Sequence, residues 1–118
     1  MAKYVILIYG NRQRWENITD EEMAQIDAGH GAFVARAGNA ILASGQLEPS
    51  NRATSLRAGK GGKPMITDGP FLETKEVLGG FYVIEVAHVN EAISLASLLA
   101  EVRQDHSGVQ VHPLVDHG

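Results

Sequence analysis

The sequence contains no cysteine, which excludes a disulfide framework, a thiolate nucleophile and a cysteine-based zinc site. It also has no apolar stretch long enough to cross a bilayer, and the opening apolar run is shorter than the core of a signal peptide. Basic residues are in deficit, since 10 lysines and arginines stand against 14 acidic residues and the formal net charge is −4. A protein that binds nucleic acid usually carries a basic face. We therefore expect a cytoplasmic protein without a nucleic-acid or membrane partner, a metal or a cofactor.

The chain of 118 residues suits one domain with one hydrophobic core, so we take residues 1–118 as a single domain. The segment 4–9 is apolar without alternation, which predicts a strand covered on both faces. A polar loop is expected at 11–17, followed by a helix. Thr19 as N-cap and Glu22 at the third helical position form a capping box. The pair Gly38-Asn39 is expected to end this helix.

The rest of the chain predicts a hairpin, further strands and a second helix. The expected elements are a strand at 40–44, hairpin arms at 52–58 and 63–67, a turn at 68–71, loop or one helical turn at 72–78, a strand at 81–87, a helix from about 91 to 104 capped by Asn90, and an edge strand at 109–115. The expected buried face of the second helix holds Ala92, Leu95, Ala96, Leu99 and Val102. Without the hairpin, this order is the ferredoxin-like βαββαβ pattern of an α+β fold.

Both helices of a ferredoxin-like fold lie on one face of the sheet, yet strands 4–9 and 81–87 are apolar on both faces. Another layer must cover the second face. A second copy of the chain, packed sheet against sheet about a two-fold axis, is the economical solution. The alternative is that the hairpin at 52–67 folds back over the open face.

His30 is the most informative single residue, because its spacing from Ile26 and Phe33 places it on the buried stripe of the first helix. Gly29 and Gly31 flank it, and each glycine in a helix interior costs about 1 kcal/mol relative to alanine. Close approach of a ligand or of another backbone segment would explain such residues. An imidazole that titrates near neutrality suits a general acid or base. The alternative is a core histidine bonded to a carbonyl, and Asp27, one turn earlier, is either its orienting carboxylate or a solvated residue.

The turn Asp68-Gly69-Pro70-Phe71 holds the second candidate group. Asp68 would take part in chemistry if it met His30 in a cavity, but an aspartate that opens a turn more simply bonds the backbone. The candidates for ligand binding are Ser44, Phe71 and Glu73, although a charged loop is an alternative explanation for the last. The spacing of His112 and His117 matches no specific metal site.

The run Val-Leu-Gly-Gly-Phe-Tyr-Val-Ile-Glu at 77–85, with Thr-Asp-Gly-Pro-Phe-Leu-Glu-Thr-Lys-Glu at 67–76 before it, resembles the signature of the DGPF group within the YCII-related family. The segments 3–10 and 109–114 resemble the two ends of the same family, so the resemblance covers nearly the whole chain.

This resemblance implies a ferredoxin-like fold, a dimer of the α+β barrel type, and a cleft with a catalytic histidine and aspartate. The histidine corresponds to His30. The aspartate of shorter family members falls at the end of the first helix, where this chain has Ala37-Gly38-Asn39, so Asp68 of the signature is the alternative. Better understood relatives include a chloromuconolactone dehalogenase, similar in fold to muconolactone isomerases, which implies proton transfer on a lactone.

Three hypotheses about function follow from the sequence. The first is a proton-transfer enzyme of the lyase, isomerase or dehalogenase kind, which acts through His30 and Asp68 on a small polar or cyclic acid. The second is a non-catalytic ligand sensor or a regulatory partner of the transcription machinery. In the third, residues 68–85 serve only folding and dimerisation.

Overall fold

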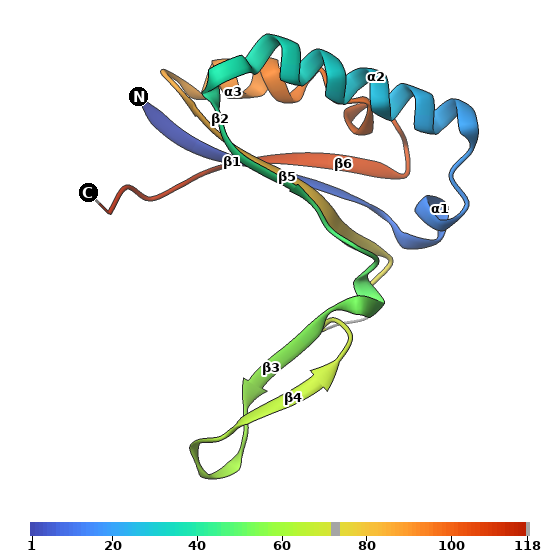
Figure 1. Cartoon of the computed structure of the whole chain (residues 1–118), viewed down its shortest axis with the longest axis vertical. Coiled ribbons are helices and arrows are strands. Elements are labelled where there is room, and N and C mark those ends of the chain that lie inside the picture. The colour runs from blue at the N-terminus through green and yellow to red at the C-terminus, as the bar shows by residue number, and fades with distance from the viewer. Residues whose placement is uncertain (72–73, 118) are drawn as a thin grey trace.

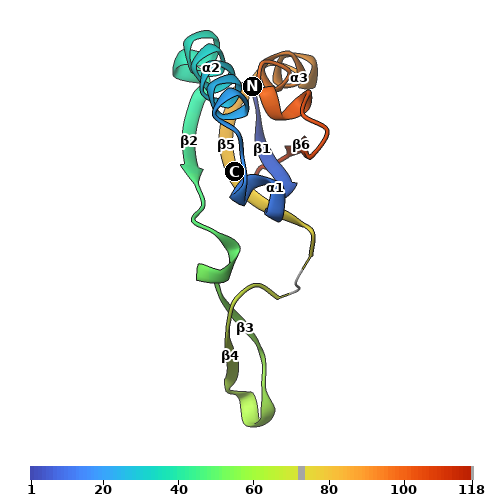
Figure 2. The ribbon, with the colours of Figure 1, turned by 90° about the vertical axis from the view of Figure 1, so that its right-hand side faces the viewer.

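The computed structural model describes residues 1–71 and 74–117 and has a mixed α+β architecture. Its main sheet contains β1 (Ala2–Asn11), β2 (Ile41–Gln46), β5 (Glu76–Val86) and β6 (Ser107–Pro113), in the order β2-β5-β1-β6 with antiparallel neighbours. The helices α2 (Asp20–Ala37) and α3 (Val89–Ala96) lie together on one face of this sheet (Figures 1 and 2). This arrangement confirms the predicted ferredoxin-like fold.

Local signals at both ends of α2 behave as the sequence predicts. The Thr19 hydroxyl accepts the backbone N–H of Glu22, and the Glu22 carboxylate accepts the backbone N–H of Thr19, so the capping box is complete. Gly38 ends the helix with φ of 53°, a conformation that favours glycine. The prediction for this helix is therefore confirmed.

The substitution Thr19→Ala is expected to lower the free energy of unfolding by about 1 kcal/mol, because the N–H of Glu22 loses its acceptor at the helix terminus. Chemical denaturation at neutral pH measures this loss. Thr19→Ser keeps the hydroxyl and should retain most of the stability. Equal destabilisation by both substitutions would contradict the capping role.

The second helix differs from the prediction in length and in phase. Helix α3 ends at Ala96 instead of continuing to residue 104, and a separate 3-10 turn, η4 (Ala100–Val102), follows. The break shifts the helical phase, so Glu101 is buried and Val102 is 46% exposed. The predicted cap at Asn90 is also wrong, because the helix starts two residues earlier, at Val89, with His88 at the N-cap position.

Two segments predicted as loop are regular structure. The short helix α1 (Arg12–Glu16) occupies the expected polar loop, capped by the Asn11 side chain. Strand β5 starts at Glu76, earlier than predicted, because residues 76–78 pair with β1 beyond a bulge. Trp15 of α1 covers this bulge, since a Cβ at Gly79 would lie 2.3 Å from its ring. Glycines therefore let the indole lie against the sheet.

The sheet has one buried face and one open face. On the helix side, alternate residues of β1 and β5 form the core with Phe33 and Leu99. Residues of the opposite parity on the same strands, Val5, Leu7, Tyr9, Phe81 and Val83, are only partly buried. The strands are therefore apolar on both faces as predicted, and the part of the chain that the structure describes leaves the second face open.

The inserted hairpin forms its own two-stranded sheet of β3 (Thr54–Ala58) and β4 (Pro64–Asp68), joined through the 3-10 turn η3 (Lys60–Gly62). A further 3-10 turn, η2 (Ser50–Arg52), leads into it, and η1 (Gly38–Ala40) leads into β2. The hairpin projects from one end of the main sheet, on the side opposite to the helices (Figures 1 and 2). It does not fold back over the open face, so that alternative is wrong for the single chain.

Candidate functional site

His30 lies on the side of α2 that faces the sheet and bonds two residues far away in the sequence. Its Nδ1 is 2.6 Å from the Tyr82 hydroxyl of β5, and its Nε2 is 2.8 Å from Oε2 of Glu101 in η4. The imidazole is about one quarter exposed, whereas the Glu101 side chain is 5% exposed. The histidine thus connects a buried carboxylate with a buried phenol.

The chemistry of these three groups determines which of them donates and which accepts in each hydrogen bond. An ionised carboxylate only accepts hydrogen bonds, so His30 donates Nε2–H to Glu101. In the neutral imidazole Nδ1 is then an acceptor, and the Tyr82 hydroxyl donates to it. Burial, together with the charge of Glu101, raises the pKa of Tyr82, which keeps the phenol protonated at neutral pH. The order Tyr82, His30, Glu101 is that of a hydroxyl, an imidazole and an orienting carboxylate.

Gly29 makes this arrangement possible by letting another backbone segment approach α2. A Cβ at this position would lie 2.7 Å from the backbone nitrogen of Ala100 and 2.9 Å from the carbonyl oxygen of Leu98. The residue next to Ala100 is Glu101, so this contact fixes the carboxylate beside His30. The predicted close approach of a backbone segment is confirmed for Gly29. Gly31 has no atom within 4 Å of such a Cβ, so packing does not require glycine there.

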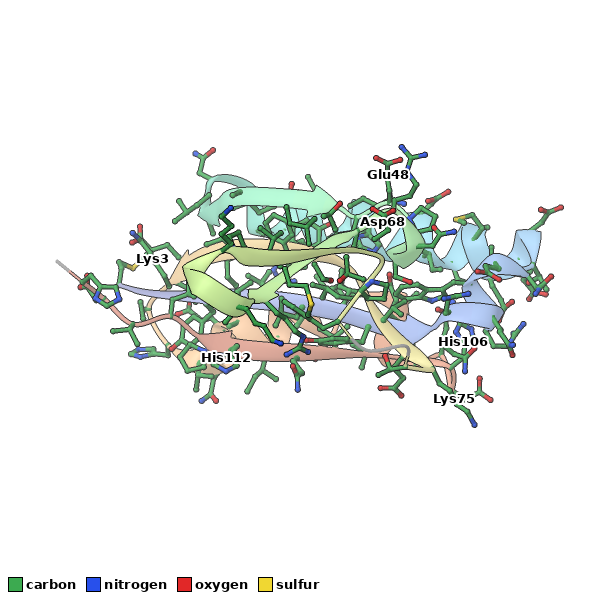
Figure 3. The ribbon with its side chains drawn as sticks, turned by 90° about the horizontal axis from the view of Figure 1, so that it is seen from below. Lys3, Glu48, Asp68, Lys75, His106 and His112 are labelled. Atoms are coloured by element: carbon green, nitrogen blue, oxygen red, sulfur yellow. The ribbon has the colours of Figure 1, made fainter. Side chains whose placement is uncertain are left out.

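The structure does not bring Asp68 and His30 together in one chain. Asp68 is the last residue of β4, pairs with Thr54 across the hairpin, and is exposed. Figure 3 shows it on the hairpin, which lies in front of the main sheet in the view from below. Asp27 is exposed too, and the partners of His30 are Tyr82 and Glu101 instead.

The other predicted residues are spread over two regions. Ser44 pairs directly with Tyr82 across β2 and β5 and is exposed, so its side chain shares the sheet face of the site. Phe71 lies at the base of the hairpin, where the Arg57 guanidinium stacks over its ring at 4.4 Å, and is 57% exposed. Glu73 lies outside the described residues.

Neither partner of His30 was predicted from the sequence, and the reason differs between the two. Glu101 stands where a continuous helix would expose it, and only the break after α3 turns it inward. Tyr82 lies on the same buried face of β5 as Ile84 and Val86, at every second position of the strand. A tyrosine at an inward-facing position usually needs a partner for its hydroxyl, and this signal would have identified it.

A second polar cluster connects α1, the N-terminal end of α2 and β6. The Trp15 indole N–H donates to the Ser107 hydroxyl, which lies 2.9 Å from Nδ1 of His106. Nε2 of His106 is 2.9 Å from the Glu22 carboxylate, which Arg14 also bonds. Figure 3 shows His106 at the α1 end of the sheet. The cluster joins the helix terminus to the last strand.

The ionised Glu22 carboxylate contributes stability that the protein loses at low pH. The backbone N–H of Thr19 chiefly lowers the pKa of this carboxyl from 4.5 to about 2, and His106, the Thr19 side chain and Arg14 act in the same direction. A carboxyl with a depressed folded-state pKa stabilises the fold above its unfolded value. That stabilisation is lost as the pH falls from about 4.5 to about 2.

The substitution Glu22→Gln is therefore expected to destabilise the protein at neutral pH, by an amount that shrinks as the pH falls through this range. Denaturant unfolding at pH values from 7 to about 2 measures the difference. Glu21→Gln, an exposed neighbour in the same helical turn, is the control and should show a much smaller effect. A Glu22→Gln deficit that persists undiminished at the acid end would contradict this role.

An open groove of about 610 Å³ runs between α2 and α3. Its apolar floor includes Val86, Leu95 and Leu98, and polar groups such as Arg36 and Ser94 stand around it. A volume of this size suits a small molecule. His30 is not part of its lining, although Leu98, at the groove, contacts the backbone of α2 beside His30.

Metal sites and membrane spans each require particular features of a chain. Within residues 1–71 and 74–117, no group of three or more His, Asp or Glu side chains comes together as a metal site would require. Nδ1 of His112 lies 3.1 Å from the carbonyl oxygen of Pro113 instead. Among the helices of this part of the chain, none has the length and the hydropathy to cross a membrane.

Comparison with known proteins identifies the family. The family model of the YCII-related domain matches residues 2–114. An uncharacterised protein of Rhizobium meliloti (strain 1021) is 32% identical over 115 residues, which cover 94% of this chain and 90% of that protein. The family suggested by the signature at 67–85 is thus confirmed over almost the full length. The chain belongs to the YCII-related family.

Proposed function

We propose that the protein is a small-molecule enzyme of proton transfer in which His30 is the acid–base group. The observation that carries this proposal is the position of the imidazole between Tyr82 and Glu101 at 2.6 and 2.8 Å. Glu101 takes the place beside His30 that the sequence suggested for Asp68. Tyr82 and Glu101 are both buried, and the imidazole is the most exposed group of the three.

The proton path follows from the direction of the hydrogen bonds. A hydroxyl donates and accepts at the same time, so Tyr82 can pass its proton to Nδ1 of His30 while its oxygen takes one from a bound acid. No free phenolate forms, which agrees with the raised pKa of Tyr82. The resulting imidazolium is stabilised by the Glu101 carboxylate on its other side. Return of the proton to another atom of the ligand completes an isomerisation, and loss of a leaving group completes an elimination.

The substrate class proposed here is a small polar or cyclic acid, which the sequence resemblance to the DGPF group also suggests. Ser44 lies beside Tyr82 on the exposed edge strand β2 and is the residue we assign to ligand contact. The lyase, isomerase and dehalogenase reactions that fit this site are those that begin with transfer of a proton next to a carbonyl or carboxyl group. Phe71 and Glu73 remain predicted contacts.

Deuterium exchange tests this proposal without knowledge of the complete reaction. The protein is incubated in D₂O with a panel of small lactones and cyclic acids, and loss of ligand proton signals is followed by NMR. We expect catalysed exchange in the wild type, a loss of about 10²-fold or more in His30→Ala, and a clear decrease in Tyr82→Phe and Glu101→Gln. Asp68→Asn is the matched control and should exchange like the wild type.

Exchange that survives in folded His30→Ala, or that depends on Asp68 alone, would overturn the assignment. Circular dichroism of each variant separates a lost site from a lost fold.

A ligand sensor or regulatory partner is the second candidate, favoured by one observation. Both ring nitrogens of His30 already have partners within the chain, as in a structural histidine. The two functions differ in one result, because a sensor binds members of the same panel without catalysing exchange.

We also propose that the chain is a cytoplasmic homodimer. The apolar residues on the open face of β1 and β5 are only partly buried, and a two-fold sheet-to-sheet contact would cover them.

A further inference from the structure

The projecting hairpin has two chemically different faces, which its register defines. Leu56 pairs with Ile66, and Ala58 pairs with Pro64, so these four residues share one face. The opposite face carries Ser55 with Thr67 and Arg57 with Met65. We call residues 53–69 the arm, and the first of these faces its apolar face.

Among residues 1–71 and 74–117, none packs on the apolar face of the arm, since its side chains are exposed. Leu56 is 53% exposed and Ile66 is 65% exposed, whereas the opposite face is partly covered, because Ser55 is buried and Arg57 stacks on Phe71. A lone two-stranded hairpin is only marginally stable in water. An arm of this kind therefore needs a surface to pack on.

The charge of the arm identifies the kind of surface. Residues 53–69 contain three basic residues and one acidic residue, a formal charge of +2. The whole chain carries −4, so the remainder carries −6. The arm of one copy is thus complementary in charge to the body of a second copy.

The extended shape of the chain agrees with an arm that packs on a second copy. The radius of gyration is 16.3 Å, against about 13.5 Å for a compact domain of this length. The arm leaves the sheet on the side of its open face (Figures 1 and 2). A second copy that packs on the open face of the sheet would therefore lie next to the arm.

We propose that the arm clasps a second copy of this chain, with Leu56 and Ile66 buried against the partner. This inference rests on the homodimer proposed above and adds to it: the dimer is held by the arms as well as by the sheets. Since burial of one Leu or Ile side chain is worth roughly 1.5–3 kcal/mol, loss of one such contact corresponds to a change of about tenfold or more in the dissociation constant.

Sedimentation velocity over a range of protein concentrations tests this inference on matched variants. Ile66→Glu and Thr67→Glu place the same charge at adjacent positions on opposite faces of β4. A third variant joins Ala53 to Gly69 through two glycines; the N–H of Gly69 already donates to the carbonyl of Ala53 at 2.6 Å, so the junction fits. We expect the wild type to be a dimer. Its dissociation constant should rise in Ile66→Glu and in the shortened chain by about tenfold or more for each of the two equivalent contacts that is lost. In Thr67→Glu it should rise less than threefold.

An unchanged dimer in the shortened chain would overturn the clasp and leave the sheet-to-sheet dimer standing. Equal weakening by Ile66→Glu and Thr67→Glu would overturn it too, since charge alone would then account for the effect. A wild type that is monomeric at all concentrations would overturn both the clasp and the dimer. None of these outcomes bears on the exchange assay, which tests the proton-transfer site separately.

Discussion

Gly29→Ala is expected to lower the free energy of unfolding by roughly 2 kcal/mol or more, in the range of overpacking a tight contact. The added methyl group would meet backbone atoms of Ala100 and Leu98 at 2.7 and 2.9 Å, and backbone cannot rotate away as a side chain can. Helix α2 and the segment 98–101 must therefore separate. Denaturant unfolding measures the loss of stability, and the separation should also weaken the bond between His30 and Glu101.

Gly31→Ala is the matched control, because it changes the same residue type in the same helix. Its Cβ would point into open space, and alanine favours the helix over glycine by about 1 kcal/mol. We expect this variant to be slightly more stable than the wild type. Equal effects of the two substitutions would contradict the close approach at Gly29.

Phe33→Ala is expected to destabilise the protein by about 3–5 kcal/mol, the usual cost of emptying a large aromatic site in a core. The Phe33 side chain is fully buried, and its ring centroid lies 4.3 Å from that of Tyr82. The cavity would therefore adjoin the proposed proton-transfer site. Thermal or chemical denaturation measures the loss.

Phe33→Leu keeps most of the apolar volume and should cost much less than Phe33→Ala. The two variants also separate packing from chemistry: deuterium exchange should decrease in proportion to the freedom that Tyr82 gains, and least in Phe33→Leu. A Phe33→Ala protein as stable as the wild type would mean that the core is not organised around this ring.

The first helix and the strand order were predictable because their signals are local. The capping box at Thr19 and the left-handed Gly38 each act within a few residues, and the hairpin arms follow from the glycine-rich turn between them. The order of the predicted strands and helices likewise predicted the ferredoxin-like arrangement, which the structure has.

The partners of His30 were not predictable because they depend on distant parts of the chain. Glu101 is 71 residues away from His30. Its burial depends on the end of the helix at Ala96, where the sequence has no proline or glycine that would predict a helix end. A continuous helical pattern instead predicted burial of Val102. The close approach at Gly29 was signalled by the cost of a glycine in a helix, but the sequence did not identify the segment that approaches.

The tautomer of His30 tests the central claim most directly, and ¹⁵N NMR of the imidazole in its neutral state measures it. An ionised Glu101 that orients His30 predicts a proton on Nε2 and a bare Nδ1 that accepts from Tyr82. Glu101→Gln should weaken this preference, whereas Asp68→Asn should leave it unchanged. A neutral imidazole that carries its proton on Nδ1 would contradict the account, because Glu101 would then be the protonated group and Tyr82 could not pass a proton to His30.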